Sequence, residues 1–311
     1  MTMEEFNIST PEAMALLQRQ LEAWPLAAAN FKALQNVETR EMHLHHTTFA
    51  LQFNPARIAS TGAKIDSGSI KKRACFLCKA NRPPEQMELN IGNGYLLLVN
   101  PFPIFPVHFT IPAAAHTPQL ITADNCAPFA HMAALALKLP GLALFYNGPR
   151  CGASAPDHMH FQAVERHRLP LLQYIENGEP LPFSVFTDTF TDIAEATGWF
   201  RTLIGQLPVP AAEPPHEETP LNVLCTACQR ENGEPTAIRV VVIPRKAHRP
   251  NFYGTGEDEI LVSPASVDLG GVIILPAPDD FHRKFTSTHL EALIDQTCYP
   301  QTLHTHDISK Q

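Results

Sequence analysis

The chain has 311 residues, of which 31 are acidic and 23 are basic, so its formal net charge is −8 and its pI is about 6.0. An acidic chain is a poor general binder of nucleic acids or anionic membranes, because their phosphates attract basic surfaces. Charged residues make up only 17% of the sequence, which disfavours wholesale disorder. The length suits about two domains, and we expect neither a nucleic-acid partner nor a membrane partner.

Targeting segments and cysteines indicate the compartment. No stretch approaches the roughly 20 uncharged apolar residues of a membrane span, and the acidic start of the chain lacks the basic region of a signal peptide. The cysteines number seven, which favours reduced thiols over a disulfide framework. We therefore expect a cytoplasmic protein.

The first two thirds of the chain alternate between helical and extended patterns. Proline is frequent, at 29 residues, and predicts many rigid turns and few long helices. In chain order we expect helix within 1–40, an extended segment over 45–53, a loop over 56–69, strands over 95–99 and 108–111, a helix over 124–139, and strands over 142–146 and 158–165.

A proline-rich, acidic stretch over 206–220 has the composition of a linker. It predicts an N-terminal half over 1–205, which carries the histidine-bearing strand, and a C-terminal half over 221–311. The segment VVVIPRKAH of the second half echoes HFTIPAAAH of the first, which suggests that the halves are related. In the second half we expect strands over 221–226, 237–243 and 271–275 and a helix from Ser287.

The most informative segment reads NGPRCGASAPDHMHFQ. On a strand, His158, His160 and Gln162 would share one face, because side chains alternate with a period of two. The preceding turn holds Gly152 and Ser154, whose amide and hydroxyl could bind a phosphate. A neutral imidazole can attack phosphorus, and a glutamine amide can donate a hydrogen bond to a phosphate oxygen without losing a proton. The alternative is a solvated edge strand with two incidental histidines.

Three sequence blocks resemble the histidine-triad (HIT) clan, in its transferase branch where glutamine replaces the last histidine. FYNGPRCGAS is similar to the corresponding turn of diadenosine-tetraphosphate phosphorylases, and DHMHFQA resembles the active-site strand of GDP-hexose phosphorylases. The upstream block VNPFPIFPVHFTIPAAAH resembles the strand–turn–strand that precedes this motif in the clan. The whole chain also resembles an uncharacterised bacterial family within that clan.

This resemblance implies an α+β, HIT-like fold of two related halves, each with an antiparallel sheet flanked by helices, and we expect the halves to bury each other's sheets. It implies that His160 is the nucleophile that forms a covalent nucleotidyl-histidine and that Gln162 holds the phosphate oxygens beside His158. Four more residues are expected near the nucleotide and its phosphates: Asn100, Asn147, Gly152 and Ser154.

The implied activity is nucleotidyl transfer rather than hydrolysis, because glutamine cannot protonate a leaving group or help water attack as a third histidine could. We expect phosphorolysis of a nucleoside-diphosphate sugar, with inorganic phosphate as acceptor and a nucleoside diphosphate and a sugar 1-phosphate as products. One alternative is a dinucleoside-polyphosphate (diadenosine tetraphosphate) phosphorylase, and another is a non-catalytic nucleotide-binding or sensor protein. Many members of the clan dimerise, so a homodimer is possible.

Cys75 and Cys78 form a Cys-x-x-Cys pair, a spacing that lets two thiolates hold one zinc ion from a tight turn. By resemblance to the uridylyl-transfer members of the clan, His116 and His158 would complete a structural zinc site, with His108 as the rival third ligand. The alternative is that zinc has been lost and the cysteines are simply buried.

The remaining cysteines suggest little chemistry. Cys225 and Cys228 form a second pair, which we interpret as a buried and a loop cysteine rather than as half of a four-cysteine zinc ribbon. Cys151 lies in the predicted phosphate turn, and a Cys–His hydrolase built on it is the least favoured interpretation.

A polyphosphate substrate needs cations in an otherwise acidic protein. Arginine binds phosphate through two hydrogen bonds, and lysine acts as a point charge. We expect phosphate contacts from Arg57 and Arg150, which neighbour the matched motifs, and for each the alternative is an ordinary surface cation. The other candidates are Lys64, Arg245, Lys246 and Arg249.

Overall fold

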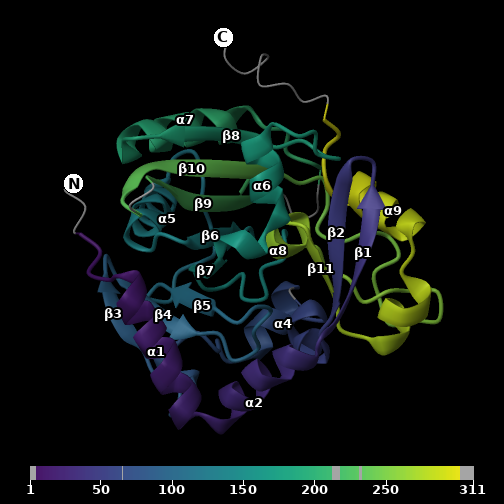
Figure 1. Ribbon diagram of the computed structural model, residues 1–311, viewed down its shortest axis with the longest axis horizontal. Helices are drawn as coiled ribbons and strands as arrows, with labels where there is room; N and C mark the ends of the chain where they lie inside the picture. Colours follow the sequence, from purple (N-terminus) through teal and green to yellow (C-terminus); the bar gives the residue numbers. More distant parts are fainter. Residues whose placement is uncertain (1–4, 65, 212–217, 231–232, 302–311) are drawn as a thin grey trace.

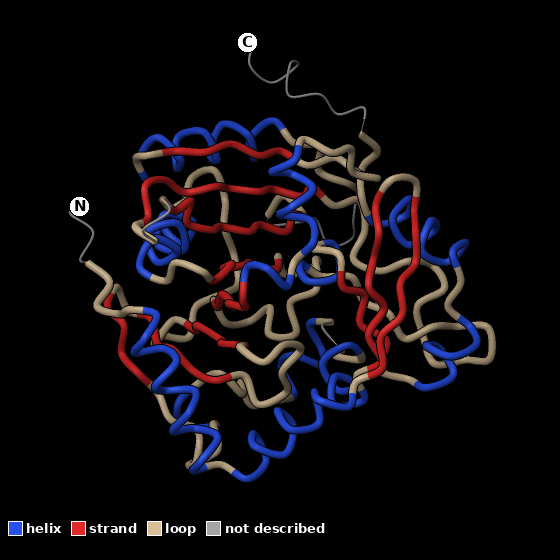
Figure 2. Tube along the Cα trace, in the orientation of Figure 1, coloured by secondary structure: helices blue, strands red, loops and turns tan. Residues whose placement is uncertain are grey.

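The computed structural model describes residues 5–64, 66–211, 218–230 and 233–301. Its centre is an eight-stranded antiparallel sheet (Figures 1 and 2). The spatial order of the strands is β3 (Leu89–Gly92), β4 (Tyr95–Val99), β5 (His108–Pro112), β7 (His160–Glu165), β6 (Leu142–Asn147), β9 (Leu221–Gln229), β10 (Pro235–Pro244) and β8 (Phe186–Phe190).

A three-stranded sheet stands beside the large one (Figure 1). β1 (Glu38–Leu44) and β2 (Thr47–Phe53) form an antiparallel hairpin, and β11 (Val272–Leu275) adds to β2 in parallel. A strand from late in the chain therefore pairs with one from its first fifty-three residues.

The helices begin at residues suited to a helix start. Proline occupies an early position of several helices, where its missing N–H costs nothing, and the Asp192 carboxylate accepts from the Glu195 amide at the start of α7. The α-helices are α1 (Thr10–Ala23), α2 (Pro25–Ala33), α3 (Ile58–Thr61), α4 (Ser67–Lys72), α5 (Ala127–Lys138), α6 (Pro170–Asn177), α7 (Ile193–Gln206), α8 (Ser266–Leu269) and α9 (Ser287–Thr297).

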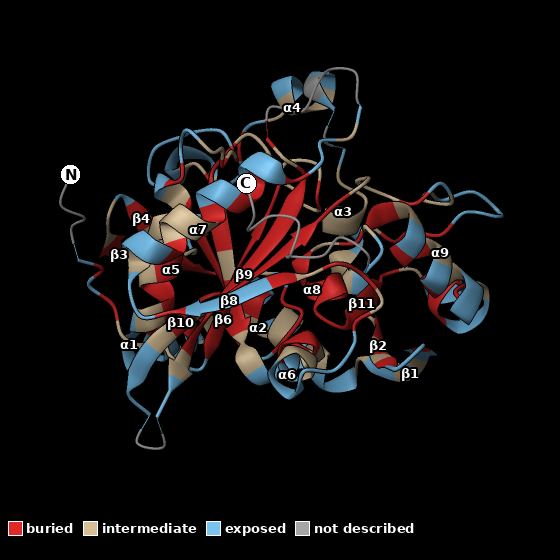
Figure 3. Ribbon diagram, turned by 90° about the horizontal axis from the view of Figure 1, so that it is seen from above, coloured by how far each residue is buried: buried red, intermediate tan, exposed pale blue. Residues whose placement is uncertain are grey.

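Both faces of the large sheet are covered, and side chains of β7 alternate between them. Phe161 and Ala163 pack in the core cluster that α1, α5 and α7 complete. Val164 packs in a second cluster with the three-stranded sheet and helices α6, α8 and α9. Figure 3 shows the central strands as buried, whereas edge strand β8 carries exposed residues. His160 and Gln162 alternate with Phe161, so they point away from α5.

The two predicted halves meet edge to edge. β6 pairs with β9 across the predicted linker, and β8 pairs with β10. We expected the halves to pack face to face, and this expectation is wrong, because backbone hydrogen bonds continue one sheet through both. The linker begins where α7 ends, and residues 212–217 of it lie outside the described part of the chain. The division at 206–220 stays a prediction.

Most predicted strands and helices are confirmed, with three differences. Residues 38–40 begin β1 rather than extend a helix, since Met42 and Leu44 alternate with polar residues and pair with β2. The predicted loop over 56–69 contains the short helix α3 and the start of α4. The histidine strand begins at His160, two residues later than expected. Among the described residues, no helix is long and apolar enough to span a membrane.

Candidate functional site

His160 is a neutral imidazole with one defined tautomer. Its Nδ1–H donates to the backbone carbonyl of His158 at 2.8 Å, so the free lone pair lies on Nε2. The residue is buried, and desolvation lowers its pKa to about 4, although the carbonyl contact acts in the opposite direction. At neutral pH His160 is therefore an unprotonated potential nucleophile.

The amide of Gln162 is oriented by a second buried histidine. His108 accepts from the Ile104 amide through Nδ1 at 3.1 Å, and its Nε2–H donates to Gln162 Oε1 at 2.8 Å. Burial lowers the pKa of His108 to about 3, with help from the charge of Arg57, so the ring is neutral at neutral pH and the two contacts define its tautomer. The Gln162 oxygen is thus occupied, and its NH₂ group is left as a hydrogen-bond donor.

Gln119 joins the start of β7 to the end of β6. Its Nε2 donates to the carbonyls of His160 at 2.9 Å and Asn147 at 3.0 Å, and its Oε1 accepts from the His160 amide at 2.7 Å. The side chain is buried. Gln119 therefore fixes the backbone of His160, and nothing in the sequence pattern marked it out.

His160 and Gln162 line a cavity of about 580 Å³. Of the predicted nucleotide-binding residues, Asn100, Ser154, Arg57 and Lys64 line it too. Part of its wall is apolar and includes the exposed rings of Phe76 and Phe102. The volume falls within the range of small-molecule sites.

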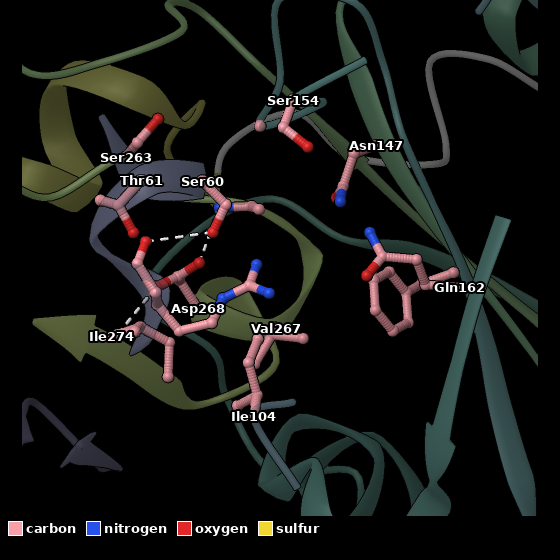
Figure 4. Close-up of a pocket in the computed structure, with 14 residues that line it drawn as sticks. Ser60, Thr61, Ile104, Asn147, Ser154, Gln162, Ser263, Val267, Asp268 and Ile274 are labelled. Carbon is pink, nitrogen blue, oxygen red and sulfur yellow. Dashed lines mark hydrogen bonds between the residues drawn. The ribbon is translucent and has the colours of Figure 1, made fainter. Parts of the chain in front are cut away.

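A smaller pocket of about 50 Å³ adjoins the cavity, and the two share Arg57, Ser60, Ser154 and Gln162. Asn147 and Gly152 also line it, and Figure 4 shows the Asn147 and Gln162 amides directed toward each other across it. The backbone of Gly152 has φ +97°, and a Cβ there would lie 2.3 Å from the Cβ of Ala265. The predicted phosphate turn therefore packs tightly at the glycine.

The two arginines expected to contact phosphate differ in position, since Arg57 lines both pockets and Arg150 does not. The Nη1 of Arg57 donates to the Phe102 carbonyl at 2.6 Å. Burial lowers the pKa of Arg57 to about 10, partly offset by Asp268, so the group stays charged. Arg150 is half-buried, lies beside His248, and is not among the described residues that line either pocket.

Arg245 and Arg249 are not free to bind phosphate. Arg245 is fully buried, with its donors on protein oxygens. Arg249 donates to Ser263 Oγ and to the carbonyls of Thr61 and Ala63. Both candidates therefore use their positively charged groups in contacts inside the protein, and neither is among the described residues that line the two pockets.

The four predicted zinc ligands lie together. Cys75, Cys78, His116 and His158 place one ligand atom each within 4.8 Å of one another. The Nδ1 of His158 lies 3.2 Å from Cys75 Sγ and 3.2 Å from His116 Nδ1. His108, the rival ligand, instead binds Gln162.

This cluster fits a tetrahedral metal site. Two sulfurs and two nitrogens around zinc lie about 3.3–3.8 Å apart, and the contacts between Cys78 Sγ and the Nδ1 atoms of His116 and His158 are 3.2 and 3.6 Å. His158 Nε2–H donates to the Ala113 carbonyl at 2.7 Å, which leaves Nδ1 for the metal. Burial raises the pKa of the Cys75 thiol, but contact with His158 and hydrogen bonds from the Leu77 and Cys78 amides together outweigh it and bring the value to about 6, which favours the thiolate.

The other cysteines offer no such chemistry. Cys225 is buried, and desolvation raises its pKa, while Cys228 is half-buried at the end of β9. Desolvation raises the pKa of Cys151 to about 12, so its thiol is protonated at neutral pH. This state argues against a Cys–His hydrolase.

Comparisons with known proteins agree with this architecture. A family model described as a domain of unknown function (DUF4922) matches residues 16–165. No curated protein matches the chain by sequence. Among solved structures, yeast Ap4A phosphorylase Apa2 has a TM-score of 0.55 at 17% identity, over 89% of this chain and 97% of that chain.

Two complexes of the same yeast enzyme are similar as well. The complex with AMP has a TM-score of 0.51 at 18% identity and covers 92% of this chain and 98% of that chain. The complex with Ap4A has a TM-score of 0.58 at 17% identity and covers 97% of this chain and 100% of that chain. The chain therefore has the α+β, HIT-like fold of this phosphorylase, with antiparallel sheets flanked by helices.

Proposed function

We propose that this protein is a nucleotidyltransferase that acts through His160, and that its substrates are a dinucleoside polyphosphate and inorganic phosphate. The observation that carries the proposal is a neutral His160, with its lone pair on Nε2, beside a glutamine amide in one large cavity. The full-length similarity to an enzyme solved with AMP and with Ap4A supports this substrate over the sugar nucleotide that we first expected.

The reaction has two displacements. In the first, His160 Nε2 attacks the α-phosphorus of the dinucleoside polyphosphate, the bond to the bridging oxygen breaks, and a nucleoside polyphosphate leaves with the electron pair. The new P–N bond puts positive charge on the ring, which the Nδ1–H contact with the His158 carbonyl stabilises. In the second, a phosphate oxygen attacks the same phosphorus, the P–N bond breaks, and a nucleoside diphosphate forms.

The cavity has groups for each part of this substrate. The NH₂ of Gln162 can donate to a non-bridging phosphate oxygen in both steps without losing a proton. Arg57 and Lys64 supply positive charge for the polyphosphate. The exposed rings of Phe76 and Phe102 can stack on nucleobases.

We also propose that the Cys75, Cys78, His116 and His158 cluster holds a structural zinc ion. Bound zinc would supply fixed geometry rather than chemistry, since all four ligands come from the protein. The turn between the two cysteines carries Phe76, which lines the cavity. Metal binding would therefore fix one wall of the substrate site.

Product analysis by mass spectrometry tests the proposal. Purified protein is incubated with Ap4A, or with a panel of nucleoside-diphosphate sugars, each with and without inorganic phosphate. We expect ADP and ATP from Ap4A only when phosphate is present. Phosphate-dependent release of a sugar 1-phosphate would instead support the sugar-nucleotide reaction, cleavage without phosphate would indicate a hydrolase, and no cleavage of any substrate would contradict an enzymatic role.

A further inference from the structure

The Asn147 side chain is held in one orientation by the protein. Its Oδ1 accepts from Asn222 Nδ2 at 2.8 Å, from the Ser266 amide at 2.9 Å and from the Ser266 hydroxyl at 2.7 Å. With the oxygen fully occupied, the NH₂ end of the amide is the one presented to the small pocket, where Gln162 presents its own (Figure 4). Two neutral donors thus face the small pocket beside the predicted phosphate turn.

Asn222 is fixed at both ends of its amide. It lies on β9 directly opposite Asn147 on β6. Its Nδ2 also donates to the Cys151 carbonyl at 2.7 Å, which ties down the phosphate turn, and its Oδ1 accepts from Arg245 Nη1 at 2.6 Å. Rotation of the Asn222 amide would break all three contacts, so Arg245 determines which end faces Asn147.

Arg245 is a fully buried cation with an unusual set of partners. Besides Asn222, its guanidinium donates to backbone carbonyls alone among the described residues, those of Thr297, Pro264, Ala247 and His248. A buried charge without a carboxylate partner is expensive. A charged donor makes stronger hydrogen bonds than a neutral one, and such a bond polarises the groups beyond it.

We propose that Arg245 and Asn222 are positioning residues for nucleotidyl transfer, which set the Asn147 amide and the turn 148–154 toward the transferred phosphate. This inference rests on the proposed function, because it assigns the Asn147 amide to the phosphate that His160 would transfer. It also gives the C-terminal segment, which lacks the histidine motif, a part in the site.

The sharpest variant is Asn222→Asp. The new carboxylate can still accept from Arg245 and gives it a counter-ion, which offsets the loss of the donors to Asn147 Oδ1 and the Cys151 carbonyl, so we expect a melting temperature near that of the wild type. It cannot donate to Asn147 Oδ1 and repels that oxygen at the 2.8 Å separation of the present contact, so we expect the Asn147 amide to turn its NH₂ away from the pocket despite the two contacts from Ser266. We expect kcat/KM for Ap4A phosphorolysis to fall on the order of a hundredfold, as for the loss of one oxyanion donor, and the affinity for AMP to fall.

A double-mutant cycle separates positioning from general damage. We expect Asn147→Ala to lose about as much activity as Asn222→Asp, and the double variant to lose no more than Asn147→Ala. If the fold losses of activity in the two single variants instead multiply in the double variant, the inference is overturned. Thr226→Ser, on the same face of β9, is the matched control, and we expect it to keep wild-type activity.

Two further measurements keep the result decisive. If Asn222→Asp fails to fold, Asn222→Ser, which lacks the amide that donates to Asn147, takes its place in the cycle with the same expectation. AMP binding by calorimetry separates this inference from the proposed function. A wild type that binds AMP without turnover would contradict the proposed function, while weaker AMP binding in Asn222→Asp would still support the positioning role. Unchanged AMP affinity in the variant, or no AMP binding by the wild type, would overturn it.

Discussion

His158 and His160 stand two residues apart, yet the structure gives them opposite properties. His158 donates from Nε2 to the Ala113 carbonyl and turns Nδ1 toward Cys75 and Cys78. His160, which lines the cavity, donates from Nδ1 to the carbonyl of His158 and so carries its lone pair on Nε2. In each case a backbone carbonyl selects the tautomer, and thereby the nitrogen that is free for chemistry.

Their pKa values diverge for physical reasons. Burial alone lowers the pKa of both rings, but contacts with the Cys75 thiolate and the Ala113 carbonyl raise that of His158. His160 has no anionic contact of that strength, so desolvation prevails and its pKa falls to about 4. In the proposed function one short segment therefore supplies both the metal ligand and the nucleophile, and four predictions test this proposal.

The largest expected effect is on turnover in His160→Gly. Without Nε2 no nucleotidyl adduct can form, so we expect phosphorolysis to fall below detection, while the metal content and AMP binding stay near wild type. Trapping the adduct with Ap4A in the absence of phosphate, followed by mass spectrometry, checks the chemistry directly. The matched control is His43→Gly, an exposed histidine on β1, and an active His160→Gly protein would refute the nucleophile.

The next largest expected effect is the loss of bound zinc from the Cys75→Ser variant. Loss of one thiolate should reduce bound zinc from about one equivalent to a small fraction and lower the melting temperature by more than about 5 °C, because the metal binds only the folded form. Elemental analysis and calorimetry measure both quantities. Cys228→Ser should change neither, and a Cys75→Ser protein with full zinc content would rule out the site.

A smaller effect is expected in Gln162→Ala. Removal of one preorganised donor should lower kcat on the order of a hundredfold. His108→Leu should lower it less, since the Gln162 amide remains but loses the contact that orients it. Steady-state kinetics checks that kcat falls further in Gln162→Ala than in His108→Leu. Equal activity of Gln162→Ala and wild type would remove glutamine from the mechanism.

The smallest effect concerns acid stability. The folded protein holds His160 and His108 at pKa values of about 4 and 3, below the ordinary value of about 6.5. Protons therefore bind preferentially to the unfolded chain. The two buried histidines leave the free energy of unfolding undiminished above about pH 6.5, and they lower it as the pH falls toward about 4. Melting temperatures between pH 4 and 7 should show a shallower decline for His108→Asn than for wild type, and an unchanged slope would contradict the burial argument.

Much of the fold was predictable because it rests on local pattern. The strands at 95–99 and 142–146 and the helix near 127–138 follow apolar periodicity with clear turn residues. The hairpin of β1 and β2 was missed because its first strand is mostly exposed and polar, so it carries little periodic signal. The edge-to-edge pairing of the two predicted halves was missed, because the pattern of a strand shows which of its faces is buried and not which strand pairs with it.

By itself the sequence determined the groups that can do the chemistry: His160 and Gln162 at strand spacing, and Cys75 and Cys78 at the spacing of a metal turn. The tertiary structure decided how they can act. The distant Ala113 carbonyl chooses the nitrogen that His158 exposes, and His108, Asn222 and Arg245 choose the end that each amide presents. These choices depend on hydrogen bonds between segments far apart in the chain, and neither composition nor periodicity encodes such pairs.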